Sequence, residues 1–369
     1  MCSKKTLVII ISSIAVSLVA VLVAGMLLLT PPTTDTASSS APSSSQETAA
    51  DKEEEGSEQK PEEEEEQEET PPCDHEYTSK VTKKSTATVQ GTLTYTCSLC
   101  NDSYTEKLPT EIKILAVGNS FSDDGMEYLW HVLTDAGVEK VTLGNLYIGG
   151  CTVDMHWNNI QNDAKAYSYR RNTDGEWITR TDSLKNALLE EEWDVITVQQ
   201  VSHLAGKPES MNNLHNVVEY LNENKTNPNA KFLWHMTWAY QKTSRHSGFL
   251  GYNMDQMTMY NAIVSTAKGI MESEPLFEGY IPCGTAIQNL RTTKVGDTLT
   301  RDGHHSSLDY GRYTLALTWM TAITGISPEK VDWVPSQYDY LSADDGIIDQ
   351  AVLDAINTPD AVTSSNFTE

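Results

Sequence analysis

Three residues have the types and the spacing that nucleophilic catalysis by a serine requires. Ser120 stands in a Gly-Asn-Ser motif that follows the apolar run 113–117. Much later in the chain, Asp302 stands three residues before His305. A serine nucleophile needs a general base, and the base needs an acid that orients it. Because this spacing lets the Asp302 carboxylate reach the His305 ring within one loop turn, we predict a catalytic triad of Ser120, His305 and Asp302.

The surrounding sequence predicts an α/β domain that would position these residues. Short apolar runs predict strands at 113–117, 141–148, 193–199, 231–237 and 277–282. Helical spacing of apolar residues marks 123–136, 182–191, 212–222, 254–271 and 308–323. Strands that alternate with helices form a parallel sheet covered on both faces, with functional loops at the carboxyl ends of its strands.

The position of Ser120 suits a nucleophile. It would lie between the first strand and the first helix, where a backbone N–H stabilises negative charge. The simpler interpretation is that Ser120 or Ser122 is only a helix N-cap. The histidine motif allows a similar alternative, a surface turn with two solvated imidazoles at His304 and His305. The two motifs together favour catalysis.

These motifs resemble those of the SGNH hydrolase superfamily, also called GDSL-type esterases. The most similar branch is bacterial, with a first block that reads Gly-Asn-Ser-Phe. The resemblance covers about residues 111–326 and includes Ser120 in the first block and Asp302 and His305 in the last. It implies a three-layer α/β/α, flavodoxin-like domain with serine esterase activity and no cofactor for catalysis. Asn119 replaces an aspartate that is mainly structural in the superfamily.

The resemblance also implies an oxyanion hole. Two of its donors would be the backbone N–H groups of Ser120 and of Gly150, which follows the second predicted strand. The superfamily takes a third donor from an asparagine side chain, which this chain lacks at that point. Gln200 carries the same amide donor on a longer side chain. By strict counting, Ser202 and His203 are alternatives.

Aromatic residues follow two of the predicted strands. The stretch 234–240 contains two tryptophans and a tyrosine, and His156 and Trp157 come soon after the second strand. Such rings stack on sugars at binding surfaces, but for Trp234 a place in the core is the favoured interpretation. Together with an exported location, the resemblance implies an ester substrate of the acylated glycan type, with O-acetyl groups foremost.

Four residues near the start of the ordered chain have the spacing of a metal site. They are Cys73, His75, Cys97 and Cys100. A Cys-x-x-Cys at a hairpin tip is half of a tetrahedral zinc site, and the other two residues supply the rest. A segment of about 37 residues has too small a core to fold alone, so structural zinc would stabilise it. The segment resembles the small Cys-x-His…Cys-x-x-Cys repeats of Gram-positive surface proteins.

Disulfides are the alternative use of the cysteines, since an exported setting permits them. One such bond could form within the predicted zinc module. Cys151 and Cys283 each follow a predicted strand. For this pair, a disulfide and two buried free thiols fit equally well.

The first 72 residues are typical of an export signal and a tether. Residues 7–29 carry no charge and are long enough as a helix to span a bilayer, while Lys4 and Lys5 would keep the C-terminal bulk outside. We predict an uncleaved anchor over 1–29, with a cleaved signal and a secreted form as the alternative. Residues 30–72 are rich in Ser, Pro and Glu and predict a disordered linker.

The expected organisation therefore has five parts. They are an anchor (1–29), a linker (30–72), a zinc-ribbon-like module (73–109), a hydrolase-like domain (110–330) and a C-terminal extension (331–369) with a helix near 347–356. The net charge of −26 argues against a nucleic-acid partner. The sequence predicts an extracellular, membrane-anchored serine esterase. Two alternatives are a non-catalytic carbohydrate-binding protein on the same scaffold and a surface protein that works through its module and tether.

Overall fold

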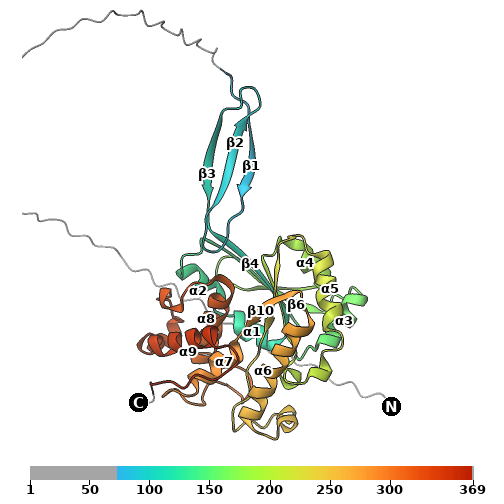
Figure 1. Ribbon diagram of the computed structural model, residues 1–369, viewed down its shortest axis with the longest axis vertical. Coiled ribbons are helices and arrows are strands. Elements are labelled where there is room, and N and C mark those ends of the chain that lie inside the picture. Colours follow the sequence, from blue (N-terminus) through green and yellow to red (C-terminus); the bar gives the residue numbers. More distant parts are fainter. Residues whose placement is uncertain (1–72, 368–369) are drawn as a thin grey trace, which may run out of the picture. The chain divides into compact units, whose positions relative to one another are not determined.

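A seven-stranded sheet lies at the centre of the domain that carries Ser120 (Figure 1). The computed structural model describes residues 73–367 of the chain. Across the sheet the strands are β10 (Phe277–Ile281), β9 (Lys231–His235), β8 (Val195–Val198), β4 (Glu111–Gly118), β5 (Lys140–Tyr147), β6 (Tyr167–Asn172) and β7 (Ile178–Asp182). The first five are parallel to one another. A mostly parallel α/β sheet is therefore confirmed.

The topology explains where a site can form. Counted along the chain, the parallel strands lie in the order 2-1-3-4-5, with β4 as the first and β8 as the third. In such a sheet the ligand crevice lies where the strand order reverses, between the first and third strands. β8 is buried along its whole length, as a central strand covered on both faces must be. Ser120 directly follows β4 and so lies at this reversal point.

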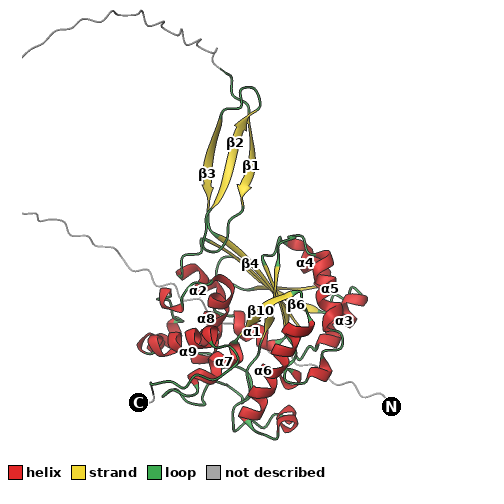
Figure 2. Cartoon of the chain, in the orientation of Figure 1, coloured by secondary structure: helices red, strands yellow, loops and turns green. Residues whose placement is uncertain are grey.

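Helices cover both faces of the sheet (Figures 1 and 2). One group of helices packs together on one face: α1 (Ser120–Met126), α2 (Leu129–Asp135), α7 (Cys283–Leu290), α8 (Tyr310–Thr324) and α9 (Asp345–Asn357). A second group packs together on the other: α3 (Val153–Gln161), α4 (Leu184–Glu190) and α5 (Leu214–Asn224). The long helix α6 (Gln256–Ser273) connects β9 to β10. The first predicted helix is split in two, because the chain leaves helical geometry at Tyr128.

The last two strands correct the prediction of a wholly parallel sheet. β6 pairs antiparallel with β5, and β7 pairs antiparallel with β6. The two form a hairpin whose connection contains Asp174 and Gly175, a pair that favours tight turns. β6 buries Tyr167 and Tyr169 but also carries the adjacent, half-buried Arg170 and Arg171, so it lacks the apolar run by which the other strands were recognised.

The C-terminal extension packs into the same core as the rest of the domain. Its helix α9 lies against α7 and α8, and Ile348 and Val352 on it are fully buried. Asn289 on α7 donates to the carbonyl of Ala351 and accepts from the N–H of Thr363. Residues beyond 330 are therefore needed to cover α7 and α8.

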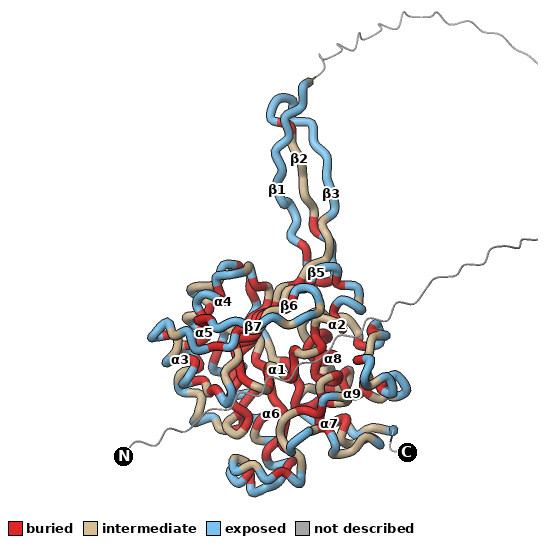
Figure 3. Tube along the Cα trace, turned by 180° about the vertical axis from the view of Figure 1, so that it is seen from behind, coloured by how far each residue is buried: buried red, intermediate tan, exposed pale blue. Residues whose placement is uncertain are grey.

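A second, three-stranded sheet comes before the α/β domain in the chain. Its strands are β1 (Tyr77–Lys83), β2 (Gly91–Cys97) and β3 (Ser103–Leu108), paired antiparallel in the order β1-β2-β3. β1 is exposed along its whole length, and in β2 only the end residues Gly91 and Cys97 are buried (Figure 3). So little apolar burial cannot offset the entropy of ordering these strands without a further constraint.

Two of the predicted parts lie outside the described residues. They are the anchor over 1–29 and the linker over 30–72. Within the part that the structure describes, no helix is both long enough and apolar enough to cross a bilayer.

Candidate active site

Ser120, His305 and Asp302 form one hydrogen-bonded series. His305 Nε2 lies 2.9 Å from Ser120 Oγ, although the two residues are 185 positions apart. His305 Nδ1 lies 2.6 Å from Asp302 Oδ2. A base within this distance of a hydroxyl can take its proton, and the carboxylate fixes the ring orientation that this needs. The structure thus brings together the three residues of the predicted triad.

Asp302 is held in its ionised form. Its Oδ1 accepts the backbone N–H groups of His304 and His305, at 3.1 and 2.8 Å. Burial alone would raise the pKa of Asp302. The hydrogen bonds from the His305 ring and from the two backbone groups outweigh burial and lower this pKa to about 2. The carboxylate therefore keeps its charge at neutral pH and can stabilise an imidazolium at His305.

Asn119 holds the start of α1, the helix that begins at Ser120. It caps α1 by accepting the N–H of Phe121, and it also accepts from the Gln199 amide at 2.8 Å. Its own amide donates to the carbonyl of Cys151 at 3.1 Å. His235 continues this buried chain, because its ring lies 2.7 Å from the Gln199 oxygen. An ionised aspartate at position 119 could accept the same hydrogen bonds but could not donate one to the carbonyl of Cys151. This explains why an asparagine suits the position.

A buried carboxylate on α1 holds the histidine loop. Asp124 is fully buried and accepts from Arg301 at 2.8 Å, from Arg312 at 2.9 Å and from the backbone N–H of Ser306 at 3.0 Å. Arg301 and Ser306 flank the segment that carries Asp302 and His305. This network therefore sets the position of the histidine loop relative to the helix that begins at Ser120.

We expect Asp124→Asn to lower both stability and turnover. Removing one partner of a buried ion pair costs about 3–5 kcal/mol, because the two guanidinium groups lose their counter-ion. Misplacing a catalytic base by about 1 Å costs about 10²-fold in rate. Thermal unfolding and ester hydrolysis measure the two effects, with kcat falling and KM for a small ester nearly constant.

Asp123→Asn is the matched control for that variant. Asp123 is the preceding residue on α1, and its partly exposed carboxylate pairs with Arg170 and accepts from the Asn145 amide. Its loss should cost less stability than the loss of the fully buried Asp124 charge, because water partly screens the pair. If Asp124→Asn turned over like the wild type, the network would have no part in placing His305.

The turn after β5 offers a donor for an oxyanion. The N–H of Cys151 donates to the carbonyl of Ile148 at 3.1 Å, and Gly150 has a φ of +65°. A type II turn needs this conformation at its third position, and glycine adopts it without strain. Within residues 73–367, no hydrogen-bond acceptor occupies the backbone N–H of Ser120 or of Gly150. Both groups are therefore free to bind a developing negative charge.

Gln200 does not lie as the sequence predicted. Its amide donates to the carbonyl and the hydroxyl of Ser210, at 2.9 and 3.2 Å. Its oxygen accepts the N–H of Val153 at 3.1 Å. The amide thus links two loops and has no hydrogen left for an oxyanion. Ser202 and His203 were the alternative side-chain donors for the oxyanion. The Ser202 hydroxyl is hydrogen-bonded to the Tyr240 hydroxyl, while the half-buried His203 ring faces His246.

The aromatic residues after β9 belong to the core rather than to a sugar-binding surface. Trp234, Trp238 and Tyr240 are all buried, and so is His156 after β5. Trp238 stacks on Phe121 at a ring distance of 4.1 Å and donates to the carbonyl of His304 at 2.9 Å. The core interpretation of Trp234 is confirmed, and Trp238 holds the loop that carries His304 and His305.

His304 is a neighbour of the triad that the motif search did not assign. Its ring centre lies 4.0 Å from that of His305, with the two rings tilted by 41°, and 4.7 Å from that of His246. Burial, and then the charge of a protonated His305, lower the pKa of His304 to about 4. The His304 ring is therefore neutral at neutral pH. Its place in a His-His doublet was the only sequence signal.

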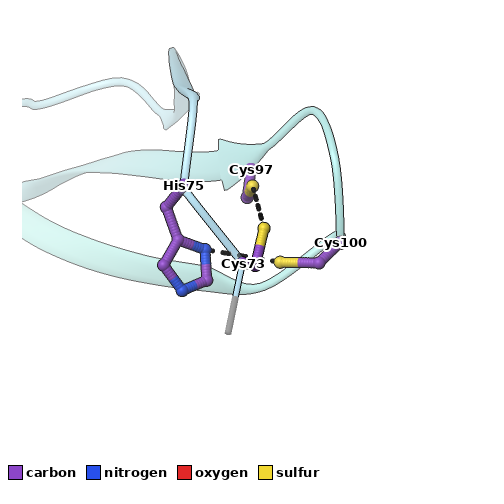
Figure 4. A group of neighbouring side chains, drawn as sticks. All are labelled: Cys73, His75, Cys97 and Cys100. Atoms are coloured by element: carbon purple, nitrogen blue, oxygen red, sulfur yellow. Dashed lines mark hydrogen bonds between the residues drawn. The ribbon is translucent and has the colours of Figure 1, made fainter. Parts of the chain in front are cut away.

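The four predicted metal ligands come together at one end of the three-stranded sheet (Figure 4). Their ligand atoms all lie within 4.8 Å of one another. Cys73 Sγ is 3.8 Å from Cys97 Sγ, and Cys100 Sγ is 3.3 Å from His75 Nδ1. A disulfide has its sulfurs about 2.05 Å apart, so these cysteines are not bonded. The cluster has the composition of a metal site.

The other two cysteines in the described part of the chain are buried free thiols. Cys151 and Cys283 are both fully buried and not joined to each other. Burial raises the pKa of Cys151 to about 12, so this thiol is not a nucleophile. Of the two states that the sequence left open, the structure has the free thiols.

Residues 113–349 match the family described as "Domain of unknown function (DUF4886)". The crystal structure of a DUF4886 family protein from Bacteroides uniformis is 38% identical, has a TM-score of 0.67, and covers 70% of this chain and 100% of its own. An α/β hydrolase enzyme from the metagenome of Lake Arreo is 13% identical at a TM-score of 0.36, covering 58% of this chain and 95% of its own. A protein from Bacillus subtilis is 15% identical at a TM-score of 0.35, and the match covers 64% of this chain and 66% of its own. Comparison with curated proteins finds no match.

Proposed function

Because the chain belongs to the DUF4886 family, whose description assigns no activity, we propose its function from the site: the protein is an ester hydrolase of the SGNH type. The observation that carries this proposal is the continuous hydrogen-bonded series from Ser120 through His305 to Asp302. Its placement after β4, at the reversal point of the sheet, adds support, since that is where such sheets bind ligands.

The residues suit a two-step acyl transfer. His305 takes the proton of Ser120 as the oxygen attacks the ester carbonyl, and Asp302 stabilises the imidazolium that results. The oxyanion binds to the backbone N–H groups of Ser120 and Gly150. His305 then protonates the departing alcohol, which leaves an acyl group on Ser120. A water molecule, deprotonated by His305, releases the acid and restores the serine.

The exposure of the site favours a small acyl group on a large alcohol. The side chain of Asp302 is 42% exposed and that of His305 is 24% exposed, so the triad lies near the surface. A shallow site admits a polymer, whereas a long acyl chain needs a deep apolar cavity. We therefore propose an O-acyl group on a carbohydrate, with O-acetyl foremost. The apolar N-terminal run supports an extracellular, membrane-anchored location for this activity.

We also propose that the cluster of Cys73, His75, Cys97 and Cys100 binds structural zinc. Two thiolates on tetrahedral zinc, each about 2.3 Å from the metal, lie about 3.8 Å apart. The Cys73 and Cys97 sulfurs have this separation. Burial opposes ionisation of Cys97, but backbone N–H groups of Leu99 and Cys100 outweigh it and lower its pKa to about 6, whereas the neighbouring Cys100 and Cys97 thiols and burial raise the pKa of Cys73 to about 12. The thiolate form that binds zinc is therefore favoured at Cys97, and Cys73 would lose its proton on binding the metal.

The test is hydrolysis of p-nitrophenyl acetate by the purified chain, combined with labelling by a fluorophosphonate. We expect turnover and one label on the tryptic peptide 114–140, which contains Ser120. Ser120→Ala should remove the label. If the wild type neither hydrolyses the ester nor takes the label, the esterase proposal falls. Retained affinity for a glycan would then favour the carbohydrate-binding alternative, for which the engaged Gln200 amide is the motive.

A further inference from the structure

His304 presents an unused ligand atom beside the catalytic carboxylate. Its Nδ1 lies 3.0 Å from Asp302 Oδ1, yet the two groups are not aligned as a hydrogen bond. This nitrogen is buried and has no hydrogen-bond partner within the described part of the chain. Buried polar atoms without partners are rare and call for an explanation such as an ion.

The atoms around it have the arrangement of a metal site. One ligand atom from each of Asp302, His304 and His305 lies within 4.8 Å of the other two. Two ligands on a tetrahedral ion with bonds of about 2.0–2.1 Å lie about 3.3 Å apart, close to the separation of Asp302 Oδ1 and His304 Nδ1. The Asp302 side chain is 42% exposed, which leaves an entry path for an ion and its remaining water ligands.

We propose that a divalent transition-metal ion such as Zn²⁺ binds to Asp302 and His304 and thereby inhibits the enzyme. The inference rests on the proposed esterase function. Imidazole nitrogen with carboxylate oxygen is a ligand set for zinc, copper or nickel, whereas Mg²⁺ prefers oxygen ligands alone. This site is separate from the four-residue cluster around Cys97 and uses none of its ligands.

Inhibition follows because the ion would disrupt the interaction between Asp302 and His305. A dication on the Asp302 carboxylate cancels the negative charge that stabilises a protonated His305. His305 Nδ1, now 2.6 Å from Asp302 Oδ2, becomes available as the third ligand once that hydrogen bond is lost. The ring proton then moves to Nε2. That nitrogen can no longer accept the proton of Ser120, so attack on the ester stops.

A second histidine provides the matched control. The ring of His246 lies against that of His304, but its Nδ1 already accepts the N–H of Gly248 at 3.0 Å. His246 also lies outside the group of ligand atoms within 4.8 Å of one another that Asp302, His304 and His305 form, so it is placed beside the proposed ion site without belonging to it. Replacing His246 removes an imidazole from the same surface and should leave the effect of zinc unchanged.

The experiment titrates ZnCl₂ against ester hydrolysis by the full chain, after the cysteine cluster has been loaded with zinc. We expect inhibition that is reversed on desalting, and no effect of MgCl₂ at the same concentrations. His304→Gln should raise the zinc concentration for half-inhibition by at least about tenfold, judged against its own zinc-free rate. His246→Gln should be inhibited like the wild type.

Three results would overturn the proposal. They are a wild type insensitive to zinc, equal sensitivity in His304→Gln, and loss of sensitivity in His246→Gln but not in His304→Gln. Calorimetry separates this proposal from the esterase proposal. If no ester is hydrolysed, one further zinc equivalent that binds the loaded wild type but not His304→Gln still supports the ion site. The absence of that equivalent overturns it.

Discussion

Ser120→Ala should lower the rate of ester hydrolysis by at least about 10⁴-fold, because no other group can form the acyl-enzyme. His305→Ala should lose about as much, since an undeprotonated serine is a poor nucleophile. The double variant should be no slower than either single one, as three groups that act as a unit do not contribute additively. Steady-state hydrolysis of p-nitrophenyl acetate measures all three rates, and thermal unfolding checks that each variant folds.

Ser122→Ala is the control for the nucleophile. Ser122 lies two residues further on α1, and its buried hydroxyl donates to the carbonyl of Asn119 and lies 2.8 Å from Asn145 Oδ1. Its loss should cost about 1–3 kcal/mol of stability and leave turnover within about tenfold of the wild type. If Ser120→Ala retained the wild-type rate while Ser122→Ala lost it, the nucleophile would be misassigned. Equal rates in all variants would show that hydrolysis occurs elsewhere.

The triad was predictable because each half of it is local. Asp302 and His305 meet within one loop, so their spacing alone places a carboxylate on an imidazole. Ser120 is located by the apolar strand before it and by the helical pattern after it. The contact between the two halves, over 185 positions, then follows from the topology of a parallel sheet, which gathers the carboxyl ends of its strands at one edge.

Contacts that depend on packing could not be derived in this way. The sequence around Gln200 does not reveal that its amide group is hydrogen-bonded to Ser210 and Val153. The same holds for Asp124, whose two arginine partners are more than 170 positions away. Trp238 follows the carboxyl end of a strand, where an aromatic ring could bind a sugar. Whether the ring faces outward, however, is decided by neighbours that are remote in sequence.

The missed elements of the fold have a common cause. The hairpin of β6 and β7 lies at the sheet edge, where β7 is exposed except at Asp182 and β6 is largely polar, so no apolar run forms. The short helix α7 is only eight residues long and is buried along its whole length, polar residues included, so its polar positions do not mark a solvent-exposed face. Periodicity identifies elements with one buried face, whereas a fully buried helix or an edge strand needs the tertiary structure to be recognised.

Removal of zinc should unfold the three-stranded sheet while the α/β domain stays folded. The strands bury little, with β1 exposed throughout and only the two end residues of β2 fully buried, so metal binding would supply most of their stability. In zinc-finger peptides this contribution is about 10–16 kcal/mol at neutral pH. After chelation, hydrogen exchange of the backbone amides in 77–108 should become fast. Ester hydrolysis should remain within about twofold, because no triad residue lies in this segment.

Variants of single residues separate a zinc ligand from a surface neighbour. Cys100→Ser should lose the metal and expose 77–108 to exchange, since three ligands hold zinc far less tightly than four. Asp74→Asn changes an exposed residue between Cys73 and His75 that is not part of the cluster, so it should keep both the metal and the protection. A chelated protein whose strands stayed protected would contradict the zinc proposal. A Cys73–Cys97 disulfide detected in the purified chain would replace it, because the two sulfurs cannot serve both roles.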